Sequence, residues 1–461
     1  MRAALVLPLL GVILLVHTSA AQSLAIPVTI PIPGQFVISG NLTGTVVGPG
    51  DNQLLLLDTD SGRLDLLLES DLGALAPLWR SDGSAFAFLN FHNVPAVSVY
   101  DLPNRSVADV LTIPDYFSYP QSWSPDGSQV LSVSYGRTNG VAQYQLQRTN
   151  VVDGASTPLF AHVVDQPISD VPLPPEATVF YLRELRQASW NPVHPEWILV
   201  QIKGYDPNLL DPVSGYPSSI VSTFLFNLQT TEMLSLDTLF QSRISTLPIH
   251  WNADGRDLVL GTDEALGTTV TVSFQQVNGV WTLEVVDAAR TLDEAAIDWL
   301  GVSDLLLTSA ADASDDAVFH IAQIIDGEWF STEFFRLPKA AFERVRDHDW
   351  HITASEEEKR SLTCLFDQAV PTQLDIGTRA RVNFTTGTPL RLRAAPSVEA
   401  AEIQQMPEGT EFTIIDGPAC DNADSYYRFW QVQLEDGAVG WATEATQTDT
   451  FIEPVPPTPA P

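Results

Sequence analysis

The chain has 461 residues, which is enough for two or three domains with a substantial hydrophobic core. Hydrophobic residues make up 44% of it and charged residues 17%, proportions typical of globular rather than disordered proteins. The net charge of −34 opposes binding to nucleic-acid phosphates and to anionic lipid surfaces, so we expect no nucleic-acid partner.

Residues 1–21 have the features of a secretory signal peptide. Arg2 supplies a positive charge, residues 3–16 are mainly apolar, and residues 19–21 (Ser-Ala-Ala) are small enough for cleavage. An uncleaved membrane anchor is the alternative, although the apolar run is short for a bilayer crossing. We therefore expect a secreted or extracytoplasmic protein with no stable membrane insertion after cleavage.

A tryptophan, a tight turn and an apolar strand recur between residues 35 and 340. The spacings between successive tryptophans are 44, 67, 61 and 48 residues. Asp-Gly in the turn suits the positive φ of a tight hairpin, and a tryptophan is large enough to fill the space between two packed sheets. The clear copies begin at Trp79, Trp123 and Trp251, and degenerate copies begin at Trp190 and Trp299.

A period of about 40–50 residues with about four strands per unit is typical of a β-propeller. The segment Trp-Ser-Pro-Asp-Gly-Ser-Gln at 123–129 resembles the WD40-like repeat of TolB-type periplasmic propellers. Five tryptophan copies, together with an atypical unit at residues 54–68, predict six blades within residues 22–342. An array of β-sandwiches is the alternative, and it gives no reason for the repeated tryptophan and turn.

The character of the chain changes after residue 342. Residues 343–372 are rich in charge and are interpreted as a linker. Short strands separated by Gly and Pro turns then predict a small β-barrel over residues 373–452. Residues 453–461 are rich in proline, and we expect an extended, disordered tail. The predicted fold class is therefore all-β, a propeller followed by a small barrel.

Four short segments of the C-terminal part form a distinctive pattern. They are Leu392-Arg393-Ala-Ala-Pro396, Gly409-Thr410, Trp430 with Val432, and Asp436-Gly437-Ala-Val-Gly440-Trp441. With these segments the C-terminal part resembles the bacterial SH3 family over about 70 residues. It departs from the family pattern by an insertion at residues 422–427 and by Ala442 in place of valine. The resemblance implies an SH3-like barrel that binds cell-wall glycopeptide or a protein.

Cys364 and Cys420 are the only cysteines. An even pair in an exported chain favours a disulfide, which would stabilise a small barrel by about 3–4 kcal/mol on a chain-entropy estimate. Two separate buried thiols are the alternative. A metal site is not expected, because two cysteines without matched histidines do not complete a tetrahedral shell.

Four aromatic residues of the barrel, Tyr426, Tyr427, Trp430 and Trp441, are candidates to line a groove for peptide or glycan. The two tryptophans have core packing as their alternative role. The chain has no Gly-x-Ser-x-Gly elbow, phosphate-binding glycine loop or His-Glu-x-x-His helix, so we expect no catalytic residues, no cofactor and no enzyme.

We therefore expect an exported binding or scaffold protein. The resemblances imply that the propeller engages a protein or an envelope component, while the barrel engages the cell wall or a partner. The rival hypothesis is a propeller enzyme or glycan-binding protein with carboxylates in its central funnel. A purely structural spacer is a third possibility, and the sequence does not predict the oligomeric state.

Overall fold

The computed structural model describes most of the chain between residues 24 and 455. The expected signal peptide at residues 1–21 lies outside the described residues. Within them, no helix is both long enough and apolar enough to cross a membrane. The described residues are 24–30, 32–42, 53–68, 73–91, 94–114, 116–169, 171–173, 177–210, 214–239, 249–252, 255–262, 268–290, 295–299, 305–311, 316–325, 328–340, 342–353, 355, 362–365, 369–383, 385, 387–421 and 427–455.

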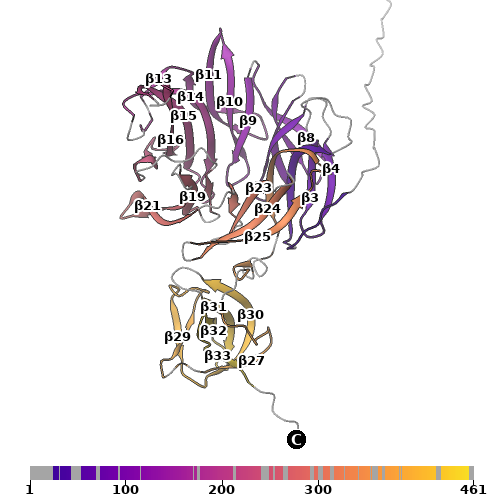
Figure 1. The fold of residues 1–461 in the computed structure, drawn as a ribbon, viewed down its shortest axis with the longest axis vertical. Helices are drawn as coiled ribbons and strands as arrows, with labels where there is room; N and C mark the ends of the chain where they lie inside the picture. The colour runs from indigo at the N-terminus through magenta and orange to yellow at the C-terminus, as the bar shows by residue number, and fades with distance from the viewer. Residues whose placement is uncertain are drawn as a thin grey trace, which may run out of the picture.

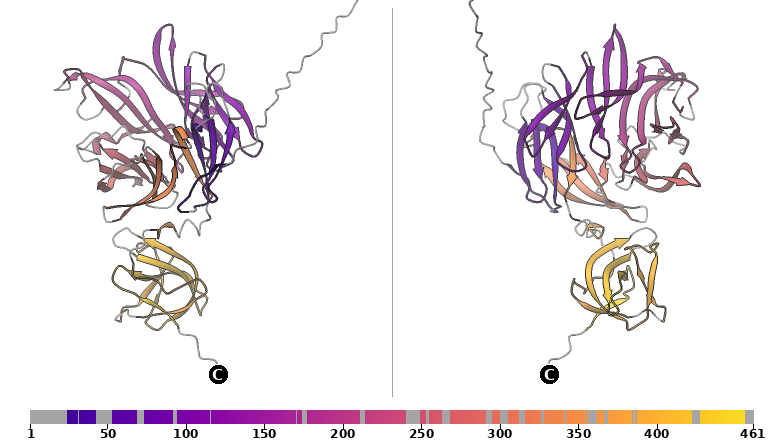
Figure 2. Two further views of the ribbon diagram at one scale, coloured as in Figure 1. Left: turned by 45° about the vertical axis from the view of Figure 1, so that its right-hand side comes forward. Right: turned by 180° about the vertical axis from the view of Figure 1, so that it is seen from behind.

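The fold is almost entirely β-structure and has two parts, a large β-propeller and a smaller barrel that contains the C-terminal strands (Figure 1). This confirms the all-β prediction. Among the described residues, the propeller part consists of six antiparallel sheets of four or five strands arranged around a centre (Figure 2).

The first three sheets contain the following strands in spatial order. The first has β1 (Leu24–Ala25), β4 (Arg63–Leu68), β3 (Gln53–Asp58), β2 (Gly34–Leu42) and β26 (Phe342–Ile352). The second has β5 (Ala74–Trp79), β6 (Ala85–Asn90), β7 (Ala96–Asp101) and β8 (Ser106–Thr112). The third has β9 (Tyr116–Trp123), β10 (Gln129–Thr138), β11 (Val141–Asn150) and β12 (Ser156–Val163).

The other three propeller sheets follow in chain order. The fourth has β13 (Pro167–Ile168), β14 (Phe180–Trp190), β15 (Trp197–Leu210), β16 (Pro217–Asn227) and β17 (Met233–Ser235), and the 3-10 turn η1 (Asp237–Leu239) follows it. The fifth has β18 (His250–Trp251), β19 (Asp257–Thr262), β20 (Thr268–Val277) and β21 (Val280–Arg290). The sixth has β22 (Ala295–Trp299), β23 (Leu305–Ala311), β24 (Ala317–Ile325) and β25 (Glu328–Leu337).

The propeller closes by pairing its last strand with its first sheet. Strand β26 pairs antiparallel with β2, and Trp350 lies opposite Phe36. The linker expected at residues 343–372 therefore begins about ten residues later, because residues 343–352 belong to the propeller. The sequence did not reveal this strand because its pairing partner lies near the N-terminus and no hairpin turn follows it.

Trp350 is a further copy of the tryptophan repeat. Its pairing with Phe36 corresponds to the pairing of Trp79 with Phe86 and of Trp123 with Val130. Strands β5, β9, β14, β18 and β22 each end at their tryptophan, whereas Trp350 lies two residues before the end of β26.

Four of the repeat tryptophans lie buried between neighbouring sheets, as predicted, namely Trp79, Trp123, Trp190 and Trp251. Trp79 packs in one cluster with Val37 and Leu54 of the first sheet, and it is 7% exposed. In the turns after Trp79, Trp123 and Trp251, the glycine lies close to the residue that follows the preceding tryptophan. At Gly255, which has a φ of 69°, a Cβ atom would lie 2.3 Å from Oδ1 of Asn191, so this position requires glycine for both space and conformation.

The C-terminal part is a seven-stranded barrel around its own core. Strand β33 pairs with β27, so Glu453 and Pro454 belong to the barrel and the tail begins later than the expected residue 453. An ion pair between Arg381 and Glu453 joins the same two strands. In spatial order the strands are β29 (Glu402–Met406), β28 (Leu390–Arg393), β32 (Val439–Thr446), β31 (Tyr427–Leu434), β30 (Glu411–Asp421), β27 (Arg379–Val382) and β33 (Ile452–Pro454).

Candidate functional site

A groove of about 570 Å³ opens on the C-terminal barrel, between the turn that precedes β30 and the turn that follows β31. Its volume lies in the range of small-ligand clefts. Gln404 of β29 is one lining residue, and the other polar ones come from the two turns and from the start of β30. These polar residues are Thr410, Glu411, Glu435 and Asp436.

Both turns are held by short-range hydrogen bonds. The hydroxyl of Thr410 donates to the carbonyl of Pro407 at 2.6 Å, and Asp436 accepts a bond from the backbone N–H of Ala438 at 3.0 Å. Glycines at 409 and 437 have φ values of 85° and 89°, which other residues adopt only with strain. These bonds and glycines therefore hold the backbone of the two turns from which the groove's side chains extend.

The groove carries net negative charge. A single guanidinium nitrogen of Arg379 lies 2.9 Å from Glu411 and 3.0 Å from Glu435, and Asp436 adds a third carboxylate. The side chain of Glu435 is 78% exposed and that of Arg379 60% exposed, so these ion pairs stabilise the fold little. The arrangement instead favours the binding of a cationic group.

The aromatic residues that the sequence suggested do not form a groove together. Trp430 is 3% exposed and Trp441 5% exposed, and both belong to the core, so the ligand-binding role is wrong for these two residues. Tyr427 is half-buried, with its ring 6.3 Å from that of Phe429. Tyr426 lies outside the described residues.

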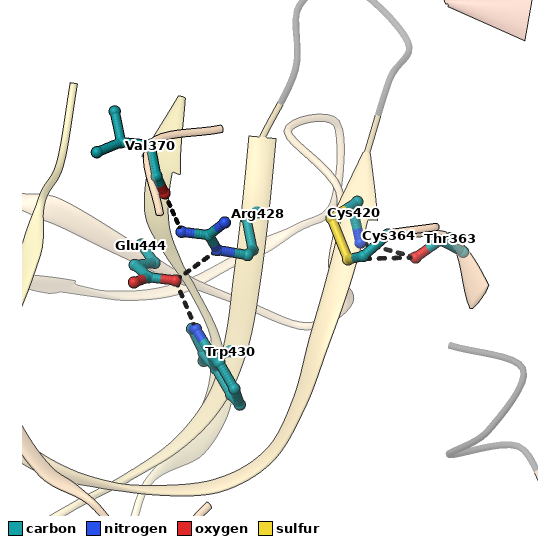
Figure 3. The surroundings of a disulfide bond; sticks show 7 residues. All are labelled: Thr363, Cys364, Val370, Cys420, Arg428, Trp430 and Glu444. Atoms are coloured by element: carbon teal, nitrogen blue, oxygen red, sulfur yellow. Dashed lines mark hydrogen bonds and ion pairs between the residues drawn. A yellow bond between two sulfur atoms is a disulfide. The ribbon is translucent and has the colours of Figure 1, made fainter. Parts of the chain in front are cut away.

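A buried ion pair joins Arg428 of β31 to Glu444 of β32 (Figure 3). Nε of Arg428 donates to Glu444 at 2.6 Å, and both side chains are almost fully buried. Glu444 also accepts bonds from the indole N–H of Trp430 and from the hydroxyl of Thr372, each at 2.7 Å. Arg428 reaches the carbonyl of Val370 as well. This network ties the segment that enters the barrel to its central strands.

Sequence reasoning missed this network, because nothing in the local pattern separates these two charged residues from surface ones. Arg428 follows a tyrosine pair in the insertion, and Glu444 lies in a run of small polar residues. Their burial follows from the pairing of β31 with β32, in which the two strands place both side chains inside. Burial of two charges is tolerated here because the two groups pair with each other and also bond to the Trp430 indole, the Thr372 hydroxyl and the Val370 carbonyl.

The disulfide between Cys364 and Cys420 is confirmed (Figure 3). It joins residues that are 56 positions apart and attaches the connecting segment to β30. The hydroxyl of Thr363 accepts a further hydrogen bond, of 2.8 Å, from the backbone N–H of Cys420.

The short turn that contains Cys364 also contacts the propeller. Leu362 and Leu365 pack against the cluster that contains Phe334 and Trp350, in the core of the sixth and first sheets. Residues 362–365 form one turn, closed by a bond from the Leu365 N–H to the Leu362 carbonyl at 3.0 Å. We call these four residues the connecting turn. Its leucines contact the propeller, while its other two residues are bonded to the barrel.

Comparison with known families identifies the C-terminal part. Residues 388–446 match the bacterial SH3 domain family. The barrel is a bacterial SH3 domain. The groove and the buried ion pair lie in or beside the matched residues, whereas Cys364 and the connecting turn precede them. No curated protein matches the chain by sequence.

The propeller is similar in fold to several solved structures. TolB from Acinetobacter baumannii has 16% identity and a TM-score of 0.46, with 70% of this chain and 68% of that chain covered. An oligogalacturonate lyase from Vibrio parahaemolyticus has 10% identity and a TM-score of 0.44, with 68% and 85% covered. The β-propeller domain of the Trilobed protease from Pyrococcus furiosus has 11% identity and a TM-score of 0.34, with 62% and 88% covered. The chain combines a β-propeller with a bacterial SH3 domain, which is the fold class that the sequence predicted.

Proposed function

We propose that this chain is an extracytoplasmic, non-catalytic binding protein whose SH3 domain holds a cationic group of a cell-wall peptide in the acidic groove. The propeller engages a protein or another component of the envelope. The observation that carries the proposal is the groove itself, which combines the volume of a ligand site with three carboxylates and one guanidinium group.

Two further features support a role outside the cytoplasm. The disulfide attaches the connecting turn to the SH3 domain, and such bonds persist in oxidising compartments. The apolar segment at residues 3–16 is the expected export signal. A cationic ligand also suits the net charge of −34, which favours encounter with positively charged groups.

The test is co-sedimentation of the full-length, oxidised protein with purified peptidoglycan sacculi at low and moderate ionic strength. The variant with both Glu435→Gln and Asp436→Asn removes two charges of the groove. Glu399→Gln removes an exposed carboxylate of the same domain that does not line the groove, and it is the matched control.

We expect the wild type and Glu399→Gln to be retained equally and the groove variant to bind about fivefold more weakly, since exposed charge contacts contribute modestly. Equal retention of the groove variant would refute the groove as the binding site. Absence of any retention would refute the wall-binding role and leave a basic protein partner as the ligand to seek.

A further inference from the structure

The hairpin of β10 and β11 projects from the third sheet, at the end of the propeller away from the SH3 domain (Figures 1 and 2). Near its tip, aromatic residues lie opposite one another in adjacent strands. Tyr135 of β10 is in register with Phe117 of β9 on one side and with Tyr144 of β11 on the other. Because directly paired residues point to the same face, these rings share one face of the sheet.

Two more rings extend this row. Tyr119 lies two residues from Phe117 and therefore on the same face, and the ring of Phe91 from the second sheet lies 6.1 Å from that of Phe117. The rings of Tyr135 and Tyr144 are 4.7 Å apart. We call these five residues, Phe91, Phe117, Tyr119, Tyr135 and Tyr144, the aromatic shelf.

The aromatic shelf lies at the exposed end of a sheet face whose other end is buried. Further along the same face, Val133 and Leu146 are buried against the fourth sheet. At the shelf, in contrast, Phe117 is 45% exposed and Tyr119 36% exposed, while Tyr135 and Tyr144 are half-buried. Adjacent exposed rings are unusual on a protein surface unless they contact a ligand.

The hydroxyl of Tyr144 remains protonated at neutral pH. Burial, with smaller contributions from Glu184, Tyr135 and Tyr119, raises the pKa of Tyr144 to about 12. Its hydroxyl is therefore a hydrogen-bond donor as well as an acceptor. The shelf thus combines flat apolar ring faces with neutral polar groups at their edges.

The sheet that carries most of the shelf differs in charge from the rest of the propeller. No residue of β9, β10, β11 or β12 is Asp or Glu, although the chain has 57 acidic residues. Each of the other five propeller sheets has at least one acidic residue in a strand. The polar strand residues of the third sheet are mainly Ser, Thr and Gln, with Arg137, Arg148 and His162. Glu184 of the fourth sheet is close enough to Tyr144 to raise the pKa of its hydroxyl.

This chemistry distinguishes between classes of partner. A basic protein segment would be recognised through carboxylates, which the third sheet lacks in a chain that is otherwise rich in them. A nucleic acid or an acidic polymer would be repelled by the chain's overall charge. A neutral sugar needs neither sign of charge. The apolar C–H face of its ring stacks on an aromatic ring, and its hydroxyls bond to neutral polar groups.

We propose that the aromatic shelf binds a neutral polysaccharide strand by stacking sugar rings on Phe117, Tyr119, Tyr135 and Tyr144. The proposal rests on the proposed function, in that it names the chemical class of the envelope component that the propeller engages. It assigns the two binding activities to opposite ends of the molecule, with the groove on the SH3 domain and the shelf at the far end of the propeller.

The test is native affinity electrophoresis of the full-length protein in gels that contain a single polysaccharide. The neutral probes are dextran, galactomannan and a soluble β-glucan, and polygalacturonate is the acidic probe. The shelf variant combines Phe117→Ala with Tyr119→Ala, two exposed positions whose truncation leaves the buried core unchanged. Val152→Ala, which truncates an 89% exposed residue in the turn between β11 and β12, is the matched control.

We expect at least one neutral polysaccharide to retard the wild type and Val152→Ala equally, with affinity about tenfold lower in the shelf variant. Polygalacturonate should retard none of the three proteins. The proposal would be overturned if no neutral probe retards the wild type, or if the shelf variant is retarded as strongly as the control. Equal urea unfolding midpoints for the three proteins would show that a lost affinity is local.

The result of the electrophoresis test of the shelf can be distinguished from the result of the sedimentation test of the groove. Sedimentation with sacculi depends on Glu435 and Asp436 and should be unchanged in the shelf variant at matched ionic strength. Failure of the electrophoresis test together with groove-dependent sedimentation would overturn the shelf alone. If the shelf variant instead loses a protein partner while no polysaccharide binds, the surface is a protein interface and the proposal is wrong.

Discussion

Loss of the disulfide between Cys364 and Cys420 should destabilise the SH3 domain and release it from the propeller. The bond joins residues 56 positions apart, and for a loop of that length a chain-entropy estimate gives about 4 kcal/mol. The hydrogen bond from Cys420 to Thr363 depends on the same attachment and contributes about 1 kcal/mol. A barrel of this size has a small core, so this is a large share of its stability.

Hydrogen exchange with mass spectrometry resolves this effect in the full-length protein. The variant with Cys364→Ser and Cys420→Ser should exchange the amides of β30 and β31 about a thousandfold faster than the oxidised wild type, which corresponds to about 4 kcal/mol. The central strands of the fourth propeller sheet, β15 and β16, are the internal control and should keep their protection. Reductant should reproduce the change in the wild type and leave the serine variant unaffected.

The same experiment tests the connecting turn. Without the disulfide, the connecting turn is attached to the barrel less firmly, so amides near Leu362 and Leu365 should lose protection together with the barrel. A change of less than about tenfold in β30 and β31 would refute the view that the bond stabilises the SH3 domain by this mechanism. Loss of protection in β15 and β16 would show instead that the variant misfolds as a whole.

Three further predictions concern the fold. Arg428→Met should cost about 3–5 kcal/mol in urea unfolding, because it leaves Glu444 buried without its cation, and a loss below about 1 kcal/mol would contradict the role of this pair. Gly255→Ala should lower the melting temperature more than Gly140→Ala, which has a similar positive φ but no atom near its missing Cβ, and equal losses would argue against the close contact between sheets. Burial raises the pKa of Asp349 from 3.8 to about 7, against two backbone N–H groups that favour its ionised form. The folded protein then retains a proton that the unfolded chain has lost, so stability should fall as the pH rises from about 4 to about 7. In Asp349→Asn, the melting temperature measured over this pH interval should depend less on pH than in the wild type.

Features with a local signal were predictable from the sequence. The tryptophan, the turn glycine and the following apolar strand lie within about ten residues of one another, and each has its own steric reason to occupy its position. The motifs of the SH3 domain are equally local. The pairing of Cys364 with Cys420 was accessible by elimination, since the chain has no other cysteine.

The candidate sites were predicted less well. Trp430 and Trp441 were candidate groove residues with core packing as their alternative role, and both lie in the core. No local pattern predicted the acidic residues that line the groove. An aromatic residue on a short strand has the same local pattern whether it faces a ligand or the interior. Which of the two it does depends on the strand that packs over it.

The sequence by itself therefore determined the repeating unit, the family of the C-terminal barrel and the disulfide partners. Only the tertiary structure decided where the propeller closes, which charges are buried and which rings remain exposed. Strand β26 resembles a charged linker until its pairing with β2 is known, and Phe117 resembles a core residue until the coverage of its face is known. Both depend on contacts between residues far apart in the chain, and such contacts leave no periodic pattern in the sequence around either residue.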